Sequence, residues 1–147
     1  LIKNVRDTLG LTVIIITHEM SVVRQVCDSV SLLEAGRIVE SGRLEDIVLD
    51  VDSRLSREIV PFPKVPEAAV AHGESVIDVS ITAHPGQPAA VALMSMVAEL
   101  GGDIAAGVFE TIGQAQIGRL AVTIPGPDTE QAVSTLRHAG IAAEVRS

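Results

Sequence analysis

Three polar residues, Thr17, His18 and Glu19, directly follow an apolar run and form the first candidate site in the chain. If that run is a strand of an open α/β sheet, these residues lie at its carboxyl end, which is the edge where such sheets bind ligands. A histidine delivered to that edge can contact a bound ligand. We therefore interpret His18 as a candidate ligand-contacting residue. The alternative is a structural role, in which the histidine only caps the end of the strand.

The element that must position His18 is the run Val-Ile-Ile-Ile at residues 13–16. Four β-branched residues in a row favour a strand. They do not alternate with polar residues, so neither face of the strand could meet water. This pattern is typical of a central strand in a parallel sheet that helices cover on both sides. The sequence therefore predicts a buried strand over residues 13–16.

The same residues resemble a known family. Val-Ile-Ile-Ile-Thr-His-Glu-Met, residues 13–20, is similar to the switch-histidine segment of ABC-transporter ATPases. Residues 1–9 resemble the helix before that strand, and residues 27–42 resemble the strand, tight turn and strand that follow it. In that family the histidine contacts the γ-phosphate of ATP and helps to hold the attacking water and the catalytic carboxylate in line. The resemblance implies this role for His18, with ATP and Mg²⁺ as cofactors of the full-length protein.

The other parts of an ATPase site are absent from the sequence. It has no Gly-x-x-x-x-Gly-Lys-Ser/Thr loop to surround the phosphates, no acidic strand end for Mg²⁺ and no Ser-Gly-Gly signature loop. Phosphoryl transfer needs positioned phosphates, a metal and an oriented nucleophile together. We therefore expect the chain, which starts with Leu1 inside a helical pattern, to be a fragment of a longer polypeptide. On its own it should bind no cofactor and should be inactive.

Composition and charge narrow the classes of function further. The 147 residues are 47% hydrophobic but only 1% aromatic, so the core must be aliphatic. The net charge is −8 and no cluster of Lys and Arg is present, which argues against binding nucleic acid or anionic lipid. No apolar run approaches the ~20 residues that cross a bilayer. Cys27 is the single cysteine, and the four histidines form no cluster, so we expect no metal site.

A proline-rich stretch divides the chain into two patterned regions. Ser53 is a plausible N-cap for a helix over residues 54–60. Three prolines within residues 61–66 disfavour helix and central strand and favour an extended spacer; a proline-rich recognition motif is the alternative. We predict three parts: an ATPase fragment at 1–50, a helix and proline-rich linker at 51–74, and a second domain at 75–147.

The second domain has clear periodicity. Alternating apolar residues predict a half-buried strand over residues 77–83. The order of elements after it predicts β-α-β-β-α-β, the ferredoxin-like split βαβ fold. Asp128 is the predicted cap of the second helix, with Gln131 as its capping-box partner, and Gly140 ends that helix. The fold class expected for the chain is therefore an α/β fragment followed by an α+β, ferredoxin-like (ACT-like) domain.

Together with the ATPase segment, this domain resembles the small C-terminal NIL domain of methionine-importer ATPases. Leu-Gly-Gly-Asp-Ile-Ala-Ala-Gly-Val at residues 100–108 stands at the place of the family's Asn-Ile-Leu signature, with Asp103 in place of Asn and Ala105 in place of Leu. The resemblance implies a domain that binds cytoplasmic methionine and lowers transport. The candidate ligand contacts are Gly102, Asp103 and Ile104. The Asp103 carboxylate would pair with an ammonium group, and backbone N–H groups near Gly102 and Ile104 would meet a carboxylate.

The resemblance also implies partners and a location. It predicts a homodimer formed through the ATPase and NIL domains, transmembrane permease subunits as partners, and methionine as a regulatory ligand. The protein would lie on the cytoplasmic face of the bacterial inner membrane, peripheral through the permease. Two other interpretations stay open: an ACT-like amino-acid sensor of another system, and a domain that only dimerises. For Asp103, the alternative is a loop residue before a strand with no ligand.

Overall fold

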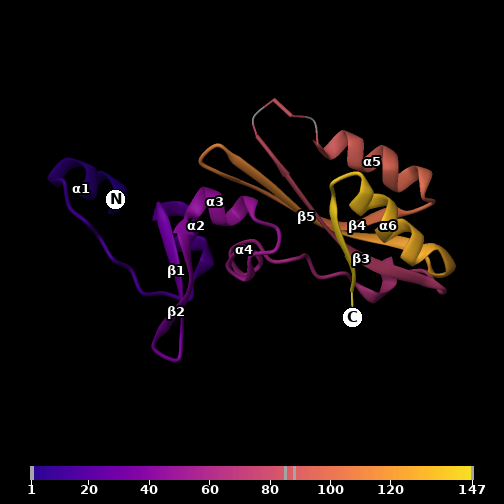
Figure 1. Cartoon of the computed structure of the whole chain (residues 1–147), viewed down its shortest axis with the longest axis horizontal. Helices are drawn as coiled ribbons and strands as arrows, with labels where there is room; N and C mark the ends of the chain where they lie inside the picture. Colours follow the sequence, from indigo (N-terminus) through magenta and orange to yellow (C-terminus); the bar gives the residue numbers. More distant parts are fainter. Residues whose placement is uncertain (1, 85, 88, 147) are drawn as a thin grey trace.

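Within residues 2–84, 86–87 and 89–146, which this computed structural model describes, the strands form a two-stranded and a four-stranded sheet (Figure 1). The first sheet is an antiparallel hairpin of β1 (Ser29–Glu34) and β2 (Arg37–Arg43). Gly36 at its turn has a φ of 76°, a backbone conformation that favours glycine in a tight hairpin. Along the chain, α1 (Ile2–Leu9) and α2 (Met20–Val26) precede the hairpin, and α3 (Leu44–Leu49) and α4 (Arg54–Ile59) follow it.

The four-stranded sheet and two helices make up the second region, which we call the small domain. It contains β3 (Glu74–Ala83), α5 (Ala89–Glu99), β4 (Asp103–Ile112), β5 (Ala115–Pro125), α6 (Thr129–His138) and β6 (Ala142–Val145). Short 3₁₀ turns, η1 (Glu67–Ala69) and η2 (Gly126–Asp128), flank it and interrupt it. The strand order is β4-β5-β3-β6 and every neighbouring pair is antiparallel. This is the ferredoxin-like arrangement, so the predicted α+β fold is confirmed.

Strand alternation gives the small-domain sheet one apolar face, which α5 and α6 cover. Ile77 and Val79 of β3 are fully buried there, together with side chains of β5 and of the two helices. Because successive side chains on a strand point to opposite faces, the residues between them face the other way. The second face carries Ser80 of β3 and Arg119 of β5, which pair across the two strands.

Gly102, between α5 and β4, is required by packing. A Cβ added there would meet the side chain of Ile124 and would lie 2.7 Å from the backbone oxygen of Thr123. We expect Gly102→Ala to lower the free energy of unfolding by ~1–3 kcal/mol, because the strand would have to shift. The measurement is urea unfolding with Gly107→Ala as control, where an added Cβ lies 3.6 Å from Leu120 in ordinary contact. Equal effects of the two changes would contradict the packing argument.

The strand predicted at residues 13–16 is absent, and this prediction is wrong for the chain as described. Residues 11–17 form no helix or strand, and the side chains of Ile14 and Ile16 are 87% and 95% exposed. A β-branched run becomes a strand only when neighbouring strands bond its backbone groups. In the described residues no strand lies beside it to do so.

The predicted capping box at Asp128 is also wrong. Asp128 makes no side-chain cap hydrogen bond, because it is the last residue of the 3₁₀ turn η2 and its backbone lies at φ −98°, ψ 1°, outside the extended conformation of a typical N-cap. The hydroxyl of Thr129 bonds back instead, donating to the Gly126 carbonyl at 2.8 Å. The predicted cap at Ser53 is confirmed, since its hydroxyl accepts from the Ser56 N–H at 2.9 Å.

A second apolar core joins the first region to the small domain. Val48, Ile59 and Val60 are fully buried, and they cluster with Ile112 and Ile117 at the far end of the β4–β5 hairpin (Figure 1). We call residues 44–63, which comprise α3, α4 and the start of the proline stretch, the joint. The joint therefore lies against the small domain.

Candidate functional site

His18 lies at the surface, two residues before α2 begins at Met20. Its side chain is 97% exposed, and its Nε2 atom is 3.8 Å from the carboxylate of Glu19, which is also exposed. The Glu19 N–H donates to the Thr17 hydroxyl at 2.9 Å, which bends the chain at this point. Among the described residues, the ion-pair contact of His18 is with the Glu19 carboxylate, and His18 does not line either of the two cavities found in the structure. The imidazole is therefore presented outward to solvent.

The three residues of the candidate ligand site lie together at the start of β4, an edge strand. Asp103 is exposed, and its Oδ1 accepts the N–H of Ile104 at 2.8 Å. The N–H of Gly102 donates to the Val97 carbonyl at 2.9 Å. Both backbone donors that were predicted to meet a ligand carboxylate thus have acceptors within the chain. Asp103 retains a second carboxylate oxygen, and in the described ranges it forms no ion pair.

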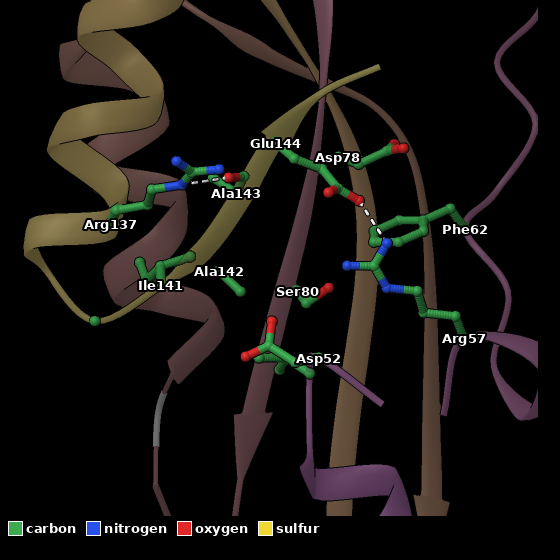
Figure 2. Close-up of a pocket in the computed structure, with 12 residues that line it drawn as sticks. Asp52, Arg57, Phe62, Asp78, Ser80, Arg137, Ile141, Ala142, Ala143 and Glu144 are labelled. Carbon is green, nitrogen blue, oxygen red and sulfur yellow. Dashed lines mark hydrogen bonds and ion pairs between the residues drawn. The ribbon is translucent and has the colours of Figure 1, made fainter. Parts of the chain in front are cut away.

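A cavity that the sequence did not predict lies between the joint and the small domain. Its volume is about 390 Å³ (Figure 2). The joint contributes Asp52, Arg57 and Phe62 to its wall, and the small domain contributes Ser80, Arg137 and the chain from α6 into β6. These residues are far apart in the sequence and only the folding of the joint onto the sheet brings them together.

The charged side chains of this cavity have different partners: one pair forms within it, and others bond a backbone carbonyl or a residue outside its lining. Arg57 pairs with Glu144 at 2.9 Å, and the Nε of Arg137 donates to the Ala143 carbonyl at 2.8 Å (Figure 2). Exposed pairs such as Arg57–Glu144 contribute at most about 1 kcal/mol each. Across the described residues, no group of three or more potential metal ligands occurs. The residues that line the cavity thus come from two parts of the chain, and the Arg57–Glu144 pair is a contact between them.

Arg119 is the most unusual charged residue in the structure and was also missed. The charged side chain of Arg119, on strand β5, is fully buried. Burial is the main cause that lowers the pKa of Arg119, to about 10; nearby Arg57 lowers it further and Glu144 opposes the shift. The guanidinium therefore stays charged at neutral pH. A single arginine in the otherwise apolar and small-residue run of β5 is the signal that could have drawn attention to it.

The fold and the site together define a class of protein in which a segment with an exposed histidine is followed by a ferredoxin-like domain. The chain is 35% identical over 147 residues to the methionine import ATP-binding protein MetN of Streptomyces griseus, covering 99% of this chain and 40% of that protein. Methionine import ATP-binding proteins of Streptomyces coelicolor and Myxococcus xanthus are 32% and 31% identical, over 99% and 98% of this chain. No protein-family model matches the chain.

The chain is therefore a homologue of methionine import ATP-binding proteins over almost its whole length, and it corresponds to their C-terminal part. This confirms the resemblance predicted from the sequence. The chain spans about two fifths of the length of the curated relatives that it matches. In the described ranges, no helix combines the length and the apolar character that crossing a membrane requires.

Proposed function

We propose that the chain is the C-terminal part of the ATP-hydrolysing subunit of a methionine importer, and that its small domain senses cytoplasmic methionine and slows transport. The observation that carries the proposal is the match to methionine import ATP-binding proteins over 99% of the chain. The ferredoxin-like fold of the small domain, which follows the His18 segment, supports it.

ATP and Mg²⁺ would act in the full-length protein, where they supply the phosphoryl group and the charge that stabilises its transfer. In the described part of this chain, His18 is the residue that we assign to this site. Its exposed imidazole fits such a role, because it can donate a hydrogen bond to a phosphate oxygen without moving a buried group. The nucleophile and the metal ligands would come from outside this chain.

The partners that we propose are a second copy of the subunit, which would associate through the ATPase and small domains, and transmembrane permease subunits. The subunit would then lie at the cytoplasmic face of the bacterial inner membrane, held there by the permease. Asp103 is exposed on β4, an edge strand of the small-domain sheet. This supports a ligand site near that edge of the small domain.

The braking action requires two states with different affinities for methionine. A ligand shifts an equilibrium only by the difference between its affinities for the two states. Methionine must therefore bind more tightly when the two ATPase halves are apart. Linkage then requires that closure of the halves by ATP weaken methionine binding by the same factor.

The test is the ATPase activity of the assembled transporter as methionine is added. We expect a decrease of several-fold to roughly a hundredfold, which corresponds to a coupling of ~1–3 kcal/mol. Alanine, which has the same ammonium and carboxylate groups and no thioether, is the control and should have little effect. A response to a different amino acid would indicate a sensor for another ligand. No response to any amino acid would favour a domain that only dimerises.

A further inference from the structure

Among the described residues, Arg119 is a buried cation that forms no ion pair with a carboxylate. Its side chain is fully buried on the second face of the small-domain sheet, and neutral groups receive its hydrogen bonds. Nη1 donates to the hydroxyl of Ser80, on the neighbouring strand. Burying a charge is costly unless hydrogen bonds compensate it. The acceptors of the remaining N–H groups of this guanidinium therefore indicate the role of the buried charge.

Those other donors bond to the joint. Nη2 donates to the hydroxyl of Ser56 at 2.9 Å, and Nε donates to the backbone oxygen of Val60 at 3.3 Å. The guanidinium carbon lies 5.0 Å from the centre of the Phe62 ring, within range of a cation–π interaction. The Ser56 hydroxyl in turn donates to the Val48 carbonyl at 3.1 Å. One side chain of the sheet thus contacts α4, the residue after it and the proline stretch, and connects through Ser56 to α3.

Two more arginines connect the same surfaces. Arg57 of α4 pairs with Glu144 of β6, and Nη2 of Arg146 donates to the Pro63 carbonyl at 3.0 Å. Arg146 also pairs with Asp78 on β3. Carbonyl groups at both ends of the segment 60–63 therefore accept hydrogen bonds from the small domain. A free spacer would leave these groups to water.

We propose that Arg119 clamps the joint to the small-domain sheet, so that residues 44–63 and the small domain move as one rigid body. The proline stretch is then not a flexible hinge at its start, and a displacement of the small domain is passed directly to α3 and α4. The buried contacts of Ile59 and Val60 with the β4–β5 hairpin act in the same direction. The contact of Arg119 with the joint involves neither methionine nor a nucleotide. The test of the clamp is therefore independent of the proposed function.

The test is hydrogen exchange on the full chain, comparing Arg119→Ala with Arg54→Ala. Arg54 lies on α4, the helix that Arg119 contacts through Ser56, but it is exposed and pairs only with Glu34 and Glu58 in the described residues. In Arg119→Ala we expect backbone amides of α4 and Val60 to exchange at least roughly tenfold faster, because hydrogen bonds from a charged donor are lost. Amides of the β3–β5 ladder should keep their protection. Arg54→Ala should leave both sets unchanged.

A second variant covers the case in which Arg119→Ala also loosens the sheet. Ser56→Ala combined with Phe62→Leu removes two partners of Arg119 from the joint side and leaves the sheet unaltered. We expect faster exchange in the joint with an unchanged β3–β5 ladder. The clamp is refuted if the joint keeps its protection in this double variant. It is equally refuted if the joint of the unmodified chain already exchanges as fast as an unstructured peptide.

Discussion

Replacing His18 with alanine in the full-length protein should slow ATP hydrolysis by roughly 10²–10⁴-fold and leave ATP affinity nearly unchanged. The size of the effect is that of a positioned group which acts on the proton or charge of the transition state. Affinity should persist because binding of the phosphates would depend on other parts of the protein. The side chain is 97% exposed, so its removal leaves no cavity in the fold. Steady-state turnover and nucleotide titration on the same preparation measure the two quantities.

The matched control for this experiment is His72→Ala, which removes another exposed histidine far from the segment. It should leave turnover unchanged. If His18→Ala weakens ATP binding as strongly as it slows turnover, the histidine contacts the nucleotide in the ground state as well. If both histidine variants have the same activity as the unmodified protein, His18 has only a structural role.

Asp103→Ala should weaken methionine binding to the chain by roughly ten- to a hundredfold. A hydrogen-bonded carboxylate that pairs with an ammonium group contributes about 1.5–3 kcal/mol, which corresponds to this range. The fold should be unaffected, because Asp103 is exposed and, in the described residues, its carboxylate accepts a hydrogen bond only from the next residue, Ile104. Calorimetry with methionine measures the change directly.

Two further variants separate charge from position. Asp128→Ala removes another exposed carboxylate, which makes no cap hydrogen bond, and it should bind methionine as the unmodified chain does. Asp103→Asn keeps an acceptor oxygen but removes the charge, so its affinity should lie between those of the aspartate and the alanine. Equal binding by all three variants would exclude Asp103 from the site.

Local patterns in the sequence were sufficient for most of the small domain. Alternating apolar residues at Ile77 and Val79 predicted β3, and the order of the elements after it predicted the ferredoxin-like fold. Such features depend on neighbours that are close in the chain, because a strand's two faces and a turn's dihedral angles follow from a few consecutive residues. The match to methionine import ATP-binding proteins likewise confirms a resemblance that rested on short consecutive segments.

Tertiary structure decided the features that depend on distant partners. Residues 13–16 have the composition of a buried strand, yet Ile14 and Ile16 are exposed because the described chain provides no strands to pair with them. Residues 61–66 form neither helix nor strand, and the docking of the joint on the small domain was not predicted. That docking depends on Arg119 reaching Ser56 and Val60 across about sixty residues of sequence. Sequence alone determined which segments could form strands, helices and turns. The burial of the Arg119 charge and the absence of a strand at residues 13–16 depend on which groups the fold places beside them.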